Sequence, residues 1–132
     1  MHHGNLLRIL RASSQTNIVQ AKLEVLAGAL AQEDFDAFVI ARVGHGIRAS
    51  EAVAAALWAV LRYWHEPEEC IVRAVGFGGD TDTIGAMAGA LMGAIHGTAW
   101  IPARWYDNIE NDENGRDAMI ELGQRLAKLD LT

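Results

Sequence analysis

Two aspartates and a threonine follow a pair of glycines in the stretch GGDTDT, residues 78–83. Asp80, Asp82 and Thr83 offer only oxygen atoms, the ligands that hard cations such as Mg²⁺ or Mn²⁺ prefer. The glycines free the backbone to turn sharply, so that both carboxylates can meet at one point. Alternatively, one aspartate caps the helix that follows while the other is solvated. Capping leaves the two glycines unexplained, and both interpretations stay open on these residues alone.

The helix expected after this motif has glycine at every fourth position, namely Gly85, Gly89, Gly93 and Gly97. At about 100° per residue these positions form one continuous ridge. The opposite side carries larger residues: Ile84, Met87, Leu91 and Ile95. Each internal glycine costs up to about 1 kcal/mol of helix stability relative to alanine. We therefore expect a neighbouring helix, or a ligand, close against the ridge, and a central helix whose first turn is rigidly held.

The rest of the chain shows helical periodicity and no segment that alternates convincingly with a period of two, which predicts an all-α protein. Caps and prolines predict where the helices begin. The expected elements are Asn17–Gln32, a helix capped by Asp34 that ends before Gly44, a helix capped by Ser50 that reaches Trp64, a helix from Pro67 through Val75, the glycine-rich helix, a short helix after Pro102, and Arg116–Leu129.

Length and charge limit the classes of function. The 132 residues suit one domain, residues 1–132, and the formal net charge of −6 argues against non-specific binding to nucleic acid. Residues 84–95 form the longest apolar run, too short to cross a membrane. The first ten residues lack the pattern of a signal peptide, and the single cysteine, Cys70, cannot form an internal disulfide. These features predict a cytoplasmic protein without a membrane partner.

Two segments of the sequence resemble one known family. GGDTDTIGAMAGALMGAIHG (78–97) and VGHGIRASEAVAAALWAVLRYW (43–64) are similar to blocks near the C-terminus of the ADP-ribosylglycohydrolase family. The resemblance covers about residues 17–128. It implies a compact orthogonal helical bundle around a central glycine-rich helix, the C-terminal part of that family's fold. It also implies hydrolysis of the bond that joins ADP-ribose to a protein side chain or to another ADP-ribose.

The resemblance assigns roles to two groups of residues. Asp80, Asp82 and Thr83 match metal ligands, and the complete site of the family holds two Mg²⁺ or Mn²⁺ ions. The loop of His45, Gly46 and Ile47 matches one that contacts the ADP-ribose moiety, although His45 stands where relatives often carry asparagine. The implied partner is an ADP-ribosylated protein or a small molecule that contains ADP-ribose.

An absence limits the resemblance. The family's N-terminal half carries a Gly-Asp segment, a catalytic glutamate and a Thr-Asp-Asp metal motif, and this sequence shows no counterpart of them. Two aspartates and one threonine are also too few to complete a six-ligand shell. We therefore expect the C-terminal part of an enzyme, inactive by itself, as a fragment or a split subunit that pairs with the missing half. The alternative is a non-catalytic helical module that binds ADP-ribose, a metal or a partner chain.

Several other residues have a structural and a functional interpretation. For Glu51 we favour stabilisation of a first helical turn over a general-base role, and for His96 we favour interaction with a helix C-terminus over metal binding. The tryptophans are expected in the core rather than stacked on adenine, and the first histidines in a disordered start. These residues are Trp58, Trp64, Trp100, Trp105, His2 and His3.

Overall fold

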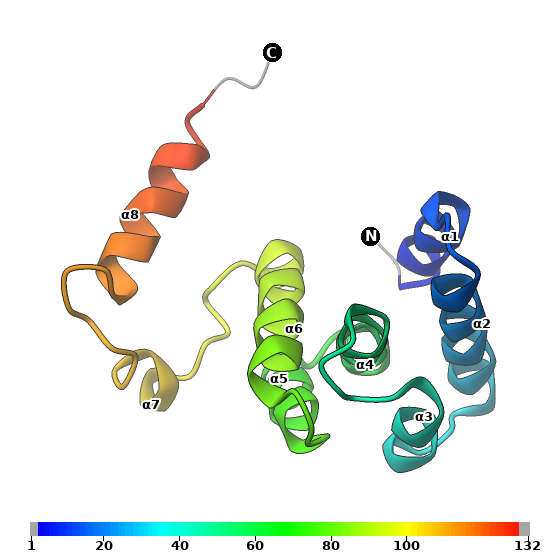
Figure 1. Ribbon diagram of the computed structural model, residues 1–132. Coiled ribbons are helices and arrows are strands. Elements are labelled where there is room, and N and C mark those ends of the chain that lie inside the picture. The colour runs from blue at the N-terminus through cyan, green and yellow to red at the C-terminus, as the bar shows by residue number, and fades with distance from the viewer. Residues whose placement is uncertain (1–2, 130–132) are drawn as a thin grey trace. The chain divides into compact units, whose positions relative to one another are not determined.

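The computed structural model describes residues 3–129. These residues form helices joined by turns and loops, and none of them lies in a strand, so the predicted all-α class is confirmed (Figure 1). The helices are α1 (His3–Ser13), α2 (Asn17–Gln32), α3 (Asp36–Val43), α4 (Ala49–Arg62), α5 (Pro67–Gly76), α6 (Thr81–His96), α7 (Ala103–Tyr106) and α8 (Arg116–Leu126). They divide into two compact units, one ending at Trp100 and one beginning at Ile101.

Helix α4 is the most deeply buried helix of the first unit (Figure 1). Ala52 and residues 54–61 are buried, and α4 packs against α2, α3, α5 and α6. Its many alanines let these neighbours approach its axis closely. The glycine-rich helix α6, which we expected to be central, packs on α4 and α5 but leaves Ala86, Ala90 and Ala94 exposed.

An aspartate on α3 fixes that helix to α4. Asp36 Oδ1 accepts a hydrogen bond of 2.9 Å from Trp58 Nε1, and Asp36 Oδ2 accepts one of 2.6 Å from the Tyr63 hydroxyl. Burial and the Asp36 carboxylate raise the pKa of Tyr63 to about 12, which keeps its hydroxyl a donor. Trp58 is fully buried, as predicted, and its only polar atom is satisfied. The start of α3 is therefore tied to the body of α4.

The glycine ridge of α6 has a close neighbour along its first half only. A Cβ atom at Gly85 would lie 3.1 Å from Val75 Cγ2 of α5, and one at Gly89 would lie 3.9 Å from Ile71 Cδ1. At Gly93 and Gly97 a Cβ atom would meet nothing within 4 Å. The expected close helix is thus α5, and only at Gly85 is its approach tighter than an ordinary van der Waals contact with a Cβ atom.

The predicted helix starts were right for α2 and α5 and wrong for α3 and α4. Helix α3 begins after Phe35, because Glu33 adopts the left-handed conformation (φ 55°) and the Asp34 N–H still donates to the Ala29 carbonyl of α2. Helix α4 begins at Ala49, so Ser50 lies inside its first turn and Arg48 is the N-cap. The N-cap residues are Phe35 and Arg48, which are not among the residue types that caps favour, so capping preferences misplaced both starts.

Helix α1 was not predicted. Leu6, Leu7 and Leu10 have helical spacing, Leu7 is buried, and α1 packs on α2. His3 begins this helix rather than a disordered start, and His2 lies outside the described residues. The apolar spacing was available in the sequence, but it spans only two turns.

The unit that begins at Ile101 contains α7 and α8. Pro102 precedes α7 as predicted, and α8 ends at Leu126 rather than at Leu129. Along α8 and just after it, Met119, Leu122, Leu126 and Leu129 are each 54–60% exposed.

Two further expectations concern the chain as a whole. Cys70 is a free, buried thiol, and burial raises its pKa to about 12. None of the helices among the described residues is long and apolar enough to span a bilayer.

The ridge yields a test of packing. Gly85→Leu should lower the free energy of unfolding by about 1–3 kcal/mol, since its side chain must displace Val75. Gly93→Leu is the matched control on the same helix and should leave stability unchanged or raise it by up to about 1 kcal/mol. Urea unfolding followed by circular dichroism measures both, and equal effects would show that α5 does not press on Gly85.

Candidate functional site

The turn between α5 and α6 is built by the two glycines of the motif. Gly78 has φ 79° and Gly79 has φ 67°, both in the left-handed region that glycine reaches without strain. Asp80 follows as the N-cap residue of α6. The predicted sharp turn before the acidic residues is confirmed.

This turn lies directly against the loop that joins α3 to α4. The backbone N–H of Asp80 donates to the carbonyl oxygen of His45 over 2.9 Å. A Cβ atom at Gly79 would lie 2.1 Å from that oxygen and 2.5 Å from His45 Nδ1, so no other residue fits there without movement. The structure therefore brings the two sequence segments that carry the family resemblance side by side.

The two aspartates of the motif are also neighbours. The pKa of Asp82 is lowered, first by a hydrogen bond with the Asp80 side chain and then by backbone N–H groups, chiefly that of Thr83. The Thr83 N–H donates to Asp82 Oδ1 over 2.9 Å. Asp80 occupies the N-cap position but forms no side-chain capping bond. Simple capping therefore does not account for Asp80.

These groups fit part of a site for a hard cation. Asp80, Asp82 and Thr83 supply carboxylate and hydroxyl oxygens at one helix start, and two adjacent carboxylates favour a bound cation that reduces their repulsion. Over residues 3–129, however, no group of three or more His, Cys, Asp or Glu side chains is arranged to hold a metal ion. The donor chemistry fits Mg²⁺ or Mn²⁺, and these three residues supply only part of a six-ligand shell.

The loop that carries His45, Gly46 and Ile47 presents one large apolar side chain to solvent. Ile47 is 88% exposed, which suits a contact surface better than a core. His45 Nδ1 is buried beside the glycine turn and has no hydrogen-bond partner. Gly44 (φ 82°) lets the chain leave α3 in a direction that other residues resist.

Sequence reasoning missed the role of Glu51 in this loop. Glu51 lies in the first turn of α4 as expected, but Oε2 accepts the Gly46 N–H over 3.1 Å. Its other oxygen, Oε1, lies 3.5 Å from Arg48 Nη1. The only sign of this contact in the sequence is the pair of glycines, Gly44 and Gly46, on either side of His45.

Other candidate residues have structural roles. His96 Nε2 lies 2.7 Å from the carbonyl oxygen of Trp64, so the ring is hydrogen-bonded near the C-terminal end of α4 rather than placed beside the acids. Trp64 is buried, and Trp100 packs against the core while Nε1 donates to the Gly97 carbonyl. Trp105 is half-buried in the second unit.

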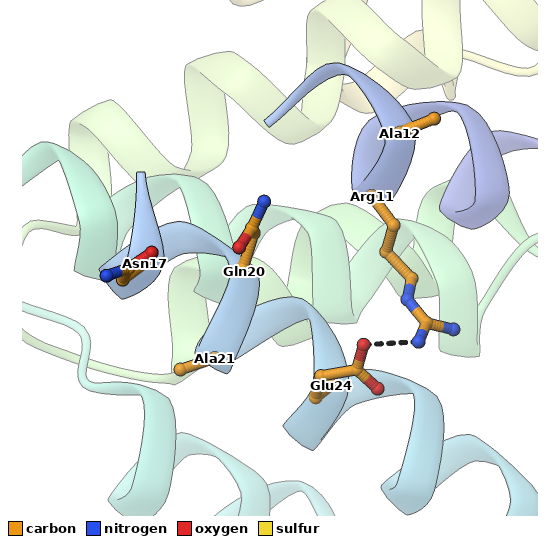
Figure 2. A pocket seen from close by; sticks show the side chains of 6 residues that line it. All are labelled: Arg11, Ala12, Asn17, Gln20, Ala21 and Glu24. Atoms are coloured by element: carbon orange, nitrogen blue, oxygen red, sulfur yellow. Dashed lines mark hydrogen bonds and ion pairs between the residues drawn. The ribbon is translucent and has the colours of Figure 1, made fainter. Parts of the chain in front are cut away.

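A hollow of about 620 Å³ lies between α1 and α2 (Figure 2). Arg11 and Glu24 form an ion pair across it, and Asn17 and Gln20 also line it. It shares no residue with the acidic turn or with the loop of His45. The hollow is therefore separate from the candidate site.

The fold is that of an all-α protein with two acidic residues, Asp80 and Asp82, at the start of a glycine-rich helix. A known family, described as ADP-ribosylglycohydrolase, matches residues 5–132. The chain belongs to this family. The match begins earlier than the residues 17–128 that the motifs indicated, and it includes residues 5–13 of α1.

Curated relatives agree with this assignment. ADP-ribosylhydrolase ARH3 of Danio rerio is 38% identical over 102 residues, which cover 69% of this chain and 26% of the relative. ADP-ribosylhydrolase ARH3 of Homo sapiens is 35% identical over 85 residues, which cover 57% of this chain and 23% of the relative. The chain thus spans about a quarter of the length of these relatives. No solved structure matches it.

The contact between turn and loop can be tested at Gly79. Gly79→Ala should lower the free energy of unfolding by about 1–3 kcal/mol, because the residue has a positive φ and its Cβ would collide with the His45 carbonyl. Gly76→Ala is the control three residues away, where a Cβ meets nothing within 4 Å. Thermal unfolding compares them, and an unaffected Gly79→Ala protein would contradict the close approach.

Proposed function

We propose that this chain forms part of the active site of a metal-dependent ADP-ribosylglycohydrolase. In this proposal Asp80, Asp82 and Thr83 bind Mg²⁺ or Mn²⁺, and the loop of residues 45–47 contacts the ADP-ribose moiety. The hydrogen bond from the Asp80 N–H to the His45 carbonyl supports it most directly, since it joins the metal segment to the substrate loop. Family membership and the names of the matched relatives support the reaction class.

The residues of the chain have distinct tasks in this proposal. Bound divalent ions would polarise oxygen atoms of the ribose and orient a water molecule for hydrolysis. The Asp80 and Asp82 carboxylates would bind the cation at the start of α6, and the hydrogen bond from the Thr83 N–H would orient Asp82. Ile47, with its exposed side chain, would cover an apolar face of the substrate.

The remaining ligands and the catalytic glutamate would come from residues outside this sequence. The shortage of acidic ligands among the described residues supports this view. The substrate would be an ADP-ribosylated protein or a small molecule that contains ADP-ribose, in the cytoplasm. The same shortage also favours a second candidate, a non-catalytic module that binds ADP-ribose, a metal or a partner chain.

Metal binding by the chain alone provides one test. We expect a dissociation constant for Mg²⁺ or Mn²⁺ weaker than about 1 mM, because two carboxylates and one hydroxyl leave most of the shell to water. Isothermal titration calorimetry measures it. Tight binding of two ions would show that the chain holds a complete site, and would contradict the proposal that ligands are missing.

Activity provides the second test, in a protein complemented by a family N-terminal half with its glutamate and Thr-Asp-Asp motif. Asp82→Asn should lower the release of ADP-ribose at least about a hundredfold, since it removes a metal-binding charge and keeps the size of the side chain. Asp107→Asn makes the same change outside both segments and should be neutral. Full activity of the Asp82→Asn protein would remove this residue from the site, and no activity in the complemented wild type would favour the binding module.

A further inference from the structure

We propose that Glu51 is a positioning residue for the candidate metal site, acting through the peptide group between His45 and Gly46. The inference deepens the proposed function and rests on it, because the segment that Glu51 positions is the one that carries Asp80 and Asp82. Glu51 acts on these two aspartates indirectly, through this peptide group.

One peptide group connects Glu51 to the start of α6. Its N–H belongs to Gly46 and donates to Glu51 Oε2 over 3.1 Å, while its C=O belongs to His45 and accepts the Asp80 N–H over 2.9 Å. The described chain contains no cis peptide bond, so this N–H and C=O point in opposite directions from one rigid plane. A rotation of the plane that breaks one hydrogen bond therefore disturbs the other.

The charge of Glu51 strengthens this connection. A carboxylate makes a stronger hydrogen bond to an N–H group than a neutral acceptor does. Because hydrogen bonds in a chain polarise one another, the carboxylate makes the His45 oxygen a better acceptor for Asp80. The Glu51 side chain is only 23% exposed, so water screens the effect little.

The loop is shaped around the Glu51 carboxylate. A Cβ atom at Gly44 would lie 2.7 Å from Glu51 Cγ, and one at Gly46 would lie 2.8 Å from Glu51 Oε2. Both glycines thus make room for this side chain. A first-turn acid that only favours a helix dipole needs no such room: Glu69 in the first turn of α5 instead pairs along its own helix with Arg73, 2.6 Å away.

Amide hydrogen exchange of the chain, followed by nuclear magnetic resonance, tests the connection. Glu51→Ala should speed the exchange of the Gly46 and Asp80 amides at least about tenfold, and Glu51→Gln should give a smaller increase. Glu69→Gln is the matched control and should leave both amides unchanged. If Glu51 only stabilised its helix, Glu51→Gln and Glu69→Gln would change the exchange of the Gly46 and Asp80 amides by the same small amount. An unchanged Asp80 amide in the folded Glu51→Gln and Glu51→Ala proteins would overturn the proposal.

Broadening of amide signals by millimolar Mn²⁺ separates this proposal from the proposed function. In the wild type we expect broadening centred on residues 80–83, and in Glu51→Gln the same broadening at several-fold higher Mn²⁺. Equal Mn²⁺ dependence of the two proteins would overturn a positioning role toward the metal. Absence of broadening in the wild type, together with faster exchange in Glu51→Ala, would refute metal binding by this segment while leaving the hydrogen-bonded connection in place.

Discussion

The peptide group between His45 and Gly46 is the point at which the two segments of the candidate site meet. Its carbonyl accepts the N–H of Asp80, the N-cap residue of α6, and its N–H donates to Glu51 in the first turn of α4. The glycines around it allow the contact, since a Cβ atom at Gly79 would collide with the His45 oxygen. If this peptide turned, the acidic motif would lose its fixed position relative to the loop of Ile47.

Helix α4 supports the contact between the acidic turn and the loop of His45. Its alanines let α5 and α6 pack on the same helix that carries Glu51, so the acidic turn and the loop share one support. Asp36 holds the start of α3 to the second half of α4 through Trp58 and Tyr63, at the end of α3 that lies away from the loop. A site on rigid helices keeps its geometry better than one on free loops.

The negative charge of the two acids at the start of α6 favours a bound cation. Asp80 and Asp82 lie within one turn of this helix start, and their side chains are neighbours. The described residues bring no third acid to them. In the proposed function a bound divalent ion would balance this charge.

The sequence by itself determined the helical class, the glycine turn and the acids at the start of α6, because each depends on local backbone preferences or on spacing within one helix. It also indicated the loop at His45 through the family resemblance. Only the tertiary structure decided that α4 is the most buried helix, that half of the glycine ridge meets α5, and that Glu51 turns back under its own loop. These outcomes depend on which helices pack together, and contacts between distant segments leave no periodic pattern in the sequence.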